Sequence, residues 1–559
     1  MAWYLDGRCV MCVDRALARM TRFSPGLVFV LALALIAVGA LLLLLFSTPQ
    51  GLGLSDDSIA YIAGARSLMQ GLGYREIWLA SSQPVTHLPP AYSFLVAAVG
   101  RLFGLDPLRG VRLVNGLLFG ANVFAVGVLG WQMTSSRAAG LILGLLFAAN
   151  ASLLRLHADA LSEPLYIFLS LLVFLSLARH VRLSDPRVRH RLGPSASGVR
   201  RPDGLALILC GSLVAAAYLT RYAGLALIGT VLVALAVLHA NWRERLASAA
   251  IFIGSLLPWL LAWAMRNRLL GGTITNRSLV WHPVTPENFE SAIYNVSEFL
   301  VPIEELRRTL IQTPGFFESV LAALGLGLLG WLAYSGVRPY FDPAASRPEV
   351  YSFVNALYMF GYLGSLIAAM VFFDASTKFS LRILSPLYVS FLVLLVAGGQ
   401  WVWTRRSSAL RAGTALCGAI IMALSAYESA GVAASLHKGG QGYASFKWYD
   451  SEAMAFLRSL PPEVKIYTNE PGAVYLYTGR GCYVLPSSFD PVTALPRPGF
   501  EAGVALMQSE IRSGTAVLAL FDSSEVSAED AGALLSGLYL AHKSAGDEIY
   551  TAAPEQAPI

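Results

Sequence analysis

Two adjacent carboxylates, Asp56 and Asp57, follow the first long apolar stretch of the chain, and Tyr61 comes one helical turn after Asp57. A helix begun at this point would put Asp57 and Tyr61 on one face. A carboxylate pair at the mouth of a membrane protein can do acid–base chemistry on a substrate held at the bilayer surface. The alternative is that Ser55 or Asp56 only caps a helix. The other charged residues of the chain have to decide between the two interpretations.

A second acidic group and several cations recur at the ends of other apolar stretches. Asp159 and Glu163 lie together before one stretch, although Ser162 and Pro164 could make that segment merely a helix start. The cations are Arg221, Arg266, Lys378 and Arg382. Each alone could be a snorkelling side chain that anchors a span. Because few charges fall deep within a span, where a transporter would more often place them, the pattern indicates a site at the membrane interface. Its carboxylates would serve a sugar or a proton, and its cations a phosphate.

The composition predicts an integral membrane protein that must hold these groups between helices. Of 559 residues, 55% are hydrophobic and 14% are charged, with a mean hydropathy of +0.57, whereas soluble domains average about 25% charged residues. The first apolar stretch, from Ser24 to Phe46, can cross a bilayer of about 30 Å and is expected to be retained. We predict about eleven transmembrane helices near residues 25–47, 109–131, 138–154, 164–180, 204–220, 223–240, 247–265, 316–334, 350–372, 384–402 and 412–430.

The arginines predict which side of the membrane each loop occupies. Arg8, Arg15, Arg19 and Arg22 precede the first span, and seven arginines lie between residues 179 and 201. More follow the spans that end near residues 240, 334 and 402. Cytoplasmic loops are enriched in Lys and Arg, so we expect a multi-pass plasma-membrane protein with a cytosolic N-terminus. Both acidic groups then lie outside, and an odd number of spans puts the C-terminus outside as well.

The chain divides by composition into three parts. Residues 1–23 are a cytosolic segment, and residues 24–436 form the membrane domain with outer loops 48–108 and 266–315. Residues 437–559 carry 8 Lys+Arg against 14 Asp+Glu and read as a small extracytoplasmic α/β domain. We expect its strands near residues 465–468, 482–485 and 515–521, its helices near 450–459, 499–512 and 527–536, and a closing hairpin over 538–551. We see no catalytic motif there and expect a cap on the outer loops.

Within the first outer loop, residues 58–70 predict a helix lying on the membrane surface that ends at Gly71 and Gly73, and a second, non-spanning helix follows His87. The five cysteines are scattered. Cys9 and Cys12 are three positions apart on the cytosolic side without a second pair, and Cys482 is the outer cysteine. We therefore expect neither a zinc site nor a structural disulfide.

The order of these pieces resembles the GT-C glycosyltransferases of the protein O-mannosyltransferase and lipid A aminoarabinose transferase type. The matching pieces are Asp56-Asp57-x-x-x-Tyr61, Gly71-x-Gly73, His87-x-Pro89-Pro90-x-Tyr92, Ser162-Glu163-Pro164-Leu165, Thr220-Arg221-Tyr222, Arg266-Asn267 and Arg382-Ile383-Leu384-Ser385-Pro386. They cover residues 24–430. This chain has Asp57 where the family usually has Glu, and Ile383 where it usually has Tyr.

The resemblance implies transfer of a sugar from a polyprenyl-phosphate donor on the outer face, with inversion. Asp56 would be the general base for a lipid, glycan or protein acceptor. Arg382, Arg266 and Arg221, in that order, would stabilise the phosphate, with Lys378 four residues before Arg382. Asp57, Tyr61, His87, Asp159 and Glu163 would complete the substrate-binding set. A divalent cation is compatible with this set but not implied, because Asp56 and Asp57 are adjacent and do not form a D-x-D pair.

Two other functions stay open on the sequence. A transporter or flippase of lipid-linked sugars would use the same substrates, and a non-catalytic protein of envelope assembly would use none. Nothing in the sequence indicates a nucleic acid, and no nucleotide-binding loop is present, in keeping with a lipid-linked donor.

Overall fold

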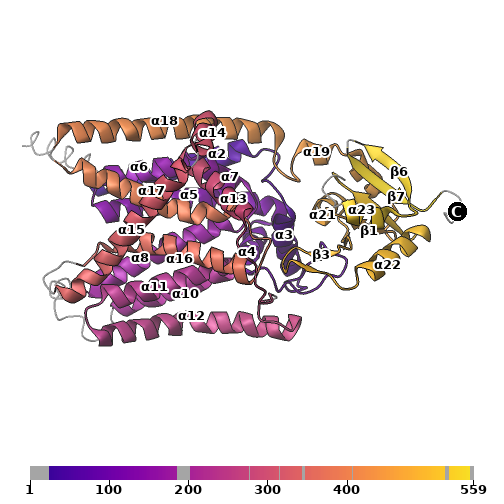
Figure 1. Ribbon diagram of the computed structural model, residues 1–559, viewed down its shortest axis with the longest axis horizontal. Helices are drawn as coiled ribbons and strands as arrows, with labels where there is room; N and C mark the ends of the chain where they lie inside the picture. Colours follow the sequence, from indigo (N-terminus) through magenta and orange to yellow (C-terminus); the bar gives the residue numbers. More distant parts are fainter. Residues whose placement is uncertain are drawn as a thin grey trace, which may run out of the picture.

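The fold is a long helical bundle with a small α/β domain at one end (Figure 1). It comes from a computed structural model, which describes residues 24–184, 202–275, 277–301, 303–313, 315–342, 347–405, 407–522, 528–544 and 546–553. The predicted cytosolic segment 1–23, with Cys9 and Cys12, lies outside these residues, and so do residues 185–201 of the arginine-rich loop.

Eight helices of the described residues are long and apolar enough to cross a membrane. They are α2 (Pro25–Ser47), α5 (Pro107–Thr134), α8 (Glu163–Ser184), α12 (Trp242–Gly271), α15 (Phe316–Phe341), α16 (Val350–Phe372), α17 (Leu381–Trp403) and α18 (Ser408–Gly439). Together with the structural similarities below, they make the chain a multi-pass membrane protein.

Three more predicted spans correspond to shorter or broken helices. Helices α6 (Arg137–Ala148) and α7 (Ala151–Ala158) together pass as one span bent by 59°. Helices α10 (Pro202–Thr220) and α11 (Leu225–Leu238), joined through the 3-10 turn η2 (Tyr222–Gly224), are apolar but shorter. The count of eleven crossings therefore stays a prediction, while the polytopic helical fold is confirmed.

The helices begin where the sequence places capping residues. The Ser24 hydroxyl accepts a hydrogen bond from the Leu27 amide, and Pro25 occupies the first turn of α2. Asp106 caps α5 in the same way, again followed by a proline. Ser380 caps α17. Because a cap fixes where the first turn begins, it also fixes which charged residue stands at that end of the bundle.

The predicted outer loops form short helices, and those of the first loop lie at the end of the bundle that carries the α/β domain (Figure 1). Helices α3 (Asp56–Met69) and α4 (Ala91–Phe103) come from the first loop, and α13 (Pro286–Leu300) and α14 (Glu304–Gln312) from the second. The expectation that α3 lies on the membrane surface is not met. Its residues Ile59, Tyr61, Ile62 and Ala63 are all buried, because α4 packs on one side and the C-terminal domain on another.

The C-terminal domain is the predicted α/β unit. Its strands β1 (Lys465–Thr468), β2 (Tyr483–Val484), β5 (Ala516–Leu520), β6 (Tyr539–Ser544) and β7 (Asp547–Thr551) form one sheet in the order β2-β1-β5-β7-β6. The β1–β2 and β1–β5 pairs are parallel, and β7 is antiparallel to both β5 and β6. The helices are α19 (Phe446–Tyr449), α20 (Glu452–Ser459), α21 (Pro471–Thr478), α22 (Phe500–Arg512) and α23 (Ala528–Leu535), and a separate hairpin joins β3 (Phe489–Asp490) to β4 (Leu495–Pro496).

Backbone hydrogen bonds join the domain to the first outer loop and to the loop between α16 and α17. The Ala80 amide donates to the Cys482 carbonyl at 2.9 Å, and the Cys482 amide donates to the Trp78 carbonyl at 3.2 Å. The Ala375 amide, between α16 and α17, donates to the Val492 carbonyl at 3.0 Å. Helix α21 packs directly on α3. The domain therefore covers the loop that carries Asp56 and Asp57.

Candidate active site

The segment before α3 is held between two other segments of the chain by isolated β-bridges, and this fixes where Asp56 stands. Gly53 pairs with Asp159, and Leu54 pairs with Gly442, both in parallel bridges. A Cβ atom on Gly53 would lie 2.1 Å from Asp159 Oδ1, so a larger residue here would have to displace the Asp159 side chain. Ser55 then takes the N-cap position of α3 without a side-chain capping bond. The capping alternative for Asp56 also fails, because its carboxylate bonds to the C-terminal domain.

Asp56 presents one held and one open carboxylate oxygen. Its Oδ1 accepts hydrogen bonds from the Tyr443 hydroxyl at 3.0 Å and from the Gly472 amide at 3.1 Å. No described residue donates to Oδ2. Burial raises the pKa of Asp56 above its usual value, and the neighbouring Asp57 adds to this, while the Tyr443 and Gly472 hydrogen bonds oppose it. A carboxylate of this kind is more basic than a solvated one.

Asp57 belongs to a cluster of two carboxylates and two guanidinium groups. Arg382 Nη2 donates to Asp57 Oδ2 at 2.7 Å, and Arg382 Nε donates to Glu163 Oε1. Arg221 Nη1 lies 2.7 Å from the same Glu163 oxygen. Glu163 is fully buried at the start of α8, whereas the side chains of Asp57 and Arg382 are 46% and 32% exposed. The cluster is thus anchored by Glu163 and open at the Asp57–Arg382 end.

Tyr61 lies beside this cluster. Its hydroxyl is 3.0 Å from the Ser162 hydroxyl, which also accepts from Arg221 Nη1 at 3.2 Å. Burial raises the pKa of Tyr61 to about 12, so its hydroxyl stays protonated near neutral pH. Two buried atoms of the cluster, Glu163 Oε2 and Arg221 Nε, have no hydrogen-bond partner in the described chain. Water or a bound group is needed to satisfy them.

Asp159 completes the acidic side of the site. It follows α7 and pairs through its backbone with Gly53, three positions before Asp56. Burial raises the pKa of Asp159 to about 7. The nearby positive charge of Arg382 opposes this rise, and the negative charge of Glu163 adds to it. Its carboxyl group therefore titrates in a range where few aspartates do.

Three predicted site residues make their contacts outside the ionic cluster. His87 Nδ1 is 3.1 Å from Glu76 Oε1. Burial and nearby Arg277 lower the pKa of His87, and the negative charge of Asp57 opposes this. Arg266 donates to the Val85 carbonyl at 2.7 Å and lies over the Trp263 ring at 4.8 Å, so it holds the first outer loop. Lys378 is exposed and has no side-chain partner among the described residues.

Comparison with solved structures identifies the fold. ArnT from Cupriavidus metallidurans bound to undecaprenyl phosphate aligns over 94% of this chain and 98% of its own, with a TM-score of 0.53 and 14% identity. The Archaeoglobus fulgidus oligosaccharyltransferase in complex with zinc and sulfate aligns over 94% and 74%, with a TM-score of 0.52 and 12% identity. The chain has the GT-C fold. No protein-family model and no curated protein sequence matches it, and identities this low establish the fold alone.

A third structure with this fold is AglB from the same archaeon, in complex with an inhibitory peptide and a dolichol-phosphate, at a TM-score of 0.50 and 13% identity. The fold expected from the ordered motifs is therefore confirmed. The roles of individual residues are a separate question, because they depend on the side chains of this chain.

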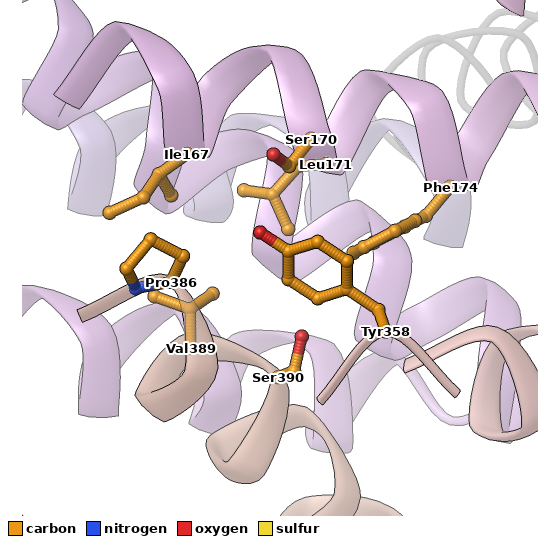
Figure 2. Close-up of a pocket in the computed structure, with 8 residues that line it drawn as sticks. All are labelled: Ile167, Ser170, Leu171, Phe174, Tyr358, Pro386, Val389 and Ser390. Atoms are coloured by element: carbon orange, nitrogen blue, oxygen red, sulfur yellow. The ribbon is translucent and has the colours of Figure 1, made fainter. Parts of the chain in front are cut away.

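Directly beneath the ionic cluster, the GT-C bundle has a small pocket between α8, α16 and α17 (Figure 2). Ile167 and Pro386, one helical turn deeper than Glu163 and Arg382, form part of its wall. Figure 2 shows Tyr358 between the residues of α8 and those of α17. The other lining residues are Ser170, Leu171, Phe174, Val389 and Ser390. The charged site is therefore closed on the bundle side by apolar side chains and a few hydroxyls.

The acidic residues do not gather as metal ligands do. No group of three or more His, Cys, Asp or Glu side chains in the described parts of the chain is arranged to hold a metal ion. Asp57 and Glu163 are instead both bonded to Arg382. A divalent ion would have to compete with that guanidinium group.

The sequence prediction missed the contribution of the C-terminal domain. Tyr443 and Gly472 contact Asp56, and Glu470 contacts Tyr443, yet none of the three belongs to a recognisable motif. The one signal was Glu470-Pro471-Gly472, an acidic residue before a proline that starts a helix. This pattern predicts α21 but not what its first turn contacts.

Proposed function

We propose that this protein is a membrane glycosyltransferase that moves a sugar from a polyprenyl-phosphate donor to an acceptor on the extracytoplasmic face, with inversion. The observation that carries the proposal is the pairing of a partly buried aspartate, Asp56, with an adjacent two-arginine cluster at one end of a GT-C fold. The GT-C structures named above include ones bound to undecaprenyl phosphate and to a dolichol-phosphate, which supports a donor of this class.

Asp56 is the general base of the proposed reaction. Its open oxygen, Oδ2, takes the proton from the acceptor hydroxyl or amine as the acceptor attacks the anomeric carbon. The bond from that carbon to the phosphate oxygen breaks, and polyprenyl phosphate leaves with its negative charge. A carboxylate whose pKa is raised by burial accepts this proton more readily than a solvated aspartate would.

Arg382 is the proposed phosphate ligand. Its exposed end is bonded to Asp57, which is itself half exposed and can turn away when a phosphate arrives. Glu163 and Arg221 stay in place behind it and keep the guanidinium plane fixed. Two arginines and two carboxylates balance in charge before the donor binds, so displacement of Asp57 leaves a net positive charge for the phosphate.

The charge distribution favours an enzyme over a transporter. Glu163 is the first residue of α8 and Arg382 the second residue of α17. The ionic cluster therefore lies at the end of the bundle, whereas secondary transporters bind their substrates near mid-membrane. A scaffold protein would have no use for the open carboxylate oxygen of Asp56.

The test is a sugar-transfer assay. Membranes from a strain that lacks the gene are mixed with the purified protein and with radiolabelled undecaprenyl-phosphate hexoses and pentoses. The membranes supply the acceptor, and label is counted in lipid, glycan and protein fractions. We expect one donor to label one fraction, and Asp56→Asn to reduce this by about 10²–10⁴-fold. Asn still accepts hydrogen bonds from Tyr443 and Gly472, so the fold is retained. Movement of donor across the membrane without transfer would instead support a flippase.

A further inference from the structure

The C-terminal domain reaches into the site at Asp56. Gly472 is in the first turn of α21, and its amide points at Asp56 Oδ1 from the positive end of that helix. A Cβ atom at Gly472 would lie 2.3 Å from the same oxygen and 3.1 Å from Tyr443 Cε2. The domain surface is thus shaped to the carboxylate and holds it from one side only.

Tyr443 lies between two carboxylates. Its hydroxyl oxygen contacts Asp56 Oδ1 at 3.0 Å and also contacts Glu470 Oε2. A tyrosine hydroxyl has one proton to donate. Both contacts can be hydrogen bonds only when one of the two carboxyl groups carries a second proton and donates it to the tyrosine oxygen. The three residues therefore share two protons, one of which belongs to a carboxylic acid.

The tyrosine is fixed in this position from several sides. Its amide donates to the Leu54 carbonyl at 2.9 Å, and its carbonyl accepts from the Tyr477 hydroxyl at 2.6 Å. Its ring packs edge-on against Trp448, with centroids 5.2 Å apart, and its side chain is buried. Glu470, in contrast, is half-buried and reaches solvent. One end of the chain of three groups thus faces the site and the other faces water.

We propose that Tyr443 and Glu470 of the C-terminal domain are positioning residues for Asp56 that share its proton and couple its ionisation to solvent. This rests on the proposed function, in which Asp56 is the base. In the resting state Glu470 holds the acid proton and donates to Tyr443, which donates to an ionised Asp56. The open oxygen of Asp56 then faces the acceptor.

The reaction changes the direction of these hydrogen bonds. The acceptor proton moves to Asp56 Oδ2, which no longer needs the tyrosine proton. Tyr443 keeps its proton and turns it to Glu470, and Glu470 releases its own proton to water. When Asp56 later loses its proton, Glu470 takes one back and the resting state returns. One acid proton belongs to the pair of carboxyl groups both before and after the transfer step.

Few other charged groups of the described residues act on Asp56 and Tyr443. Asp57 is the titratable neighbour on α3, and its charge raises the pKa of Asp56. Arg382 faces Asp57 at 2.7 Å, and the amide of Gly472 carries no titratable proton. Asp56 and Glu470 both raise the pKa of Tyr443, although burial is the largest cause. Changes at Tyr443 and Glu470 should therefore reach Asp56 without passing through the arginine cluster.

The test uses variants that separate the role of Tyr443 from that of Glu470. Tyr443→Phe removes a donor to Asp56, so we expect the acidic limb of kcat/KM for transfer to move up by roughly one pH unit. Glu470→Gln keeps a neutral donor to Tyr443, as protonated Glu470 is in the resting state, so we expect that limb to stay in place. In the double variant the limb should move as it does in Tyr443→Phe alone. Tyr477→Phe, which loses a hydroxyl at the same junction, should leave the limb unmoved.

A second readout does not depend on activity. Infrared difference spectra of the full-length protein during a pH titration follow the carboxylic acid band that Asp56→Asn removes. We expect its midpoint to rise in Tyr443→Phe and to stay in place in Glu470→Gln, which should instead remove a second carboxylic acid band, that of Glu470. An unmoved midpoint in well-folded Tyr443→Phe, or no second band that Glu470→Gln removes, would overturn the inference. Both expected results in a protein that transfers none of the tested sugars would uphold the shared proton and count against the proposed function.

Discussion

Arg382 Nη2 lies 2.7 Å from Asp57 Oδ2, although the two residues are 325 positions apart. The contact joins the helix after the first span to the start of α17, and both partners are partly exposed. On the other side of the same guanidinium group stands Glu163, which is buried. Arg382 is therefore held by one partner that cannot leave and one that can. This arrangement suits a cation that waits for an anionic ligand.

We predict that Arg382→Ala weakens binding of undecaprenyl phosphate and slows transfer together, because the phosphate is charged before and during the reaction. Arg382→Lys should retain only part of the binding affinity and of the transfer rate, since lysine keeps the charge but not the planar donor pair. The measurement is the Kd for undecaprenyl phosphate by thermophoresis or calorimetry in detergent.

The matched control is Arg66→Ala. Arg66 makes two hydrogen bonds of 2.9 Å to Asp106 but lies outside the cluster. Its loss should leave the Kd unchanged. Full recovery of affinity in Arg382→Lys would mean that the side chain only anchors the span.

We predict that Glu163→Gln destabilises the protein by about 3–5 kcal/mol, because it leaves Arg221 and Arg382 without their buried counter-charge. The free energy of unfolding in detergent, or the shift in Tm, measures this. Asp57→Asn removes the exposed carboxylate of the same cluster and should cost less than about 1 kcal/mol. Equal effects of the two variants would mean that burial does not separate their roles.

Much of the fold and half of the site followed from local pattern. Long apolar stretches predict spans directly, and Asp57, Glu163 and Arg382 each stand at the end of a helix on the same side of the bundle. Sequence position at a helix end was enough to bring these three together. The same logic failed for Arg266, because an arginine after a span can bond to any nearby carbonyl, and here it bonds to Val85.

The rest of the fold and of the candidate site depends on contacts between segments that are distant in the sequence. Helix α3 has an apolar face typical of an interfacial helix, but the C-terminal domain covers it, and nothing in the sequence of α3 records that partner. The contact of Asp56 with Gly472 joins residues 416 positions apart through a backbone amide. A backbone donor leaves no side-chain signature, so no motif could have predicted it.

We predict that Asp159→Asn raises Tm at pH 8 much more than at pH 5. The pKa of Asp159 is about 7 in the folded protein, because of burial, and about 3.9 when unfolded. The folded state therefore binds the extra proton between these values, and stability falls as pH rises through this window. Asparagine carries no charge and avoids that loss above pH 7.

Asp106→Asn provides a control of opposite sign. Burial alone would raise the pKa of Asp106, but hydrogen bonds from Arg66 and the Leu108 amide outweigh it and the pKa is lowered. Its stabilising effect is present above the unfolded pKa and is lost as pH falls through the folded one. Asp106→Asn should lower Tm at pH 8 relative to the unsubstituted protein, and lower it by less at acidic pH. A pH-independent effect of Asp159→Asn would contradict the buried, raised pKa.

We predict that the α/β domain is extracytoplasmic and that the α17–α18 loop is cytosolic. The test is labelling of single cysteines in a cysteine-free background on intact cells with a membrane-impermeant maleimide. The native Cys482 is unsuitable because it is buried. Ser513→Cys, exposed at the end of α22, should react from outside, whereas Ser408→Cys, exposed at the start of α18, should react only after permeabilisation. Labelling of Ser408→Cys with protection of Ser513→Cys in intact cells would reverse the orientation, and would move Asp56 and its arginine cluster to the cytosolic face.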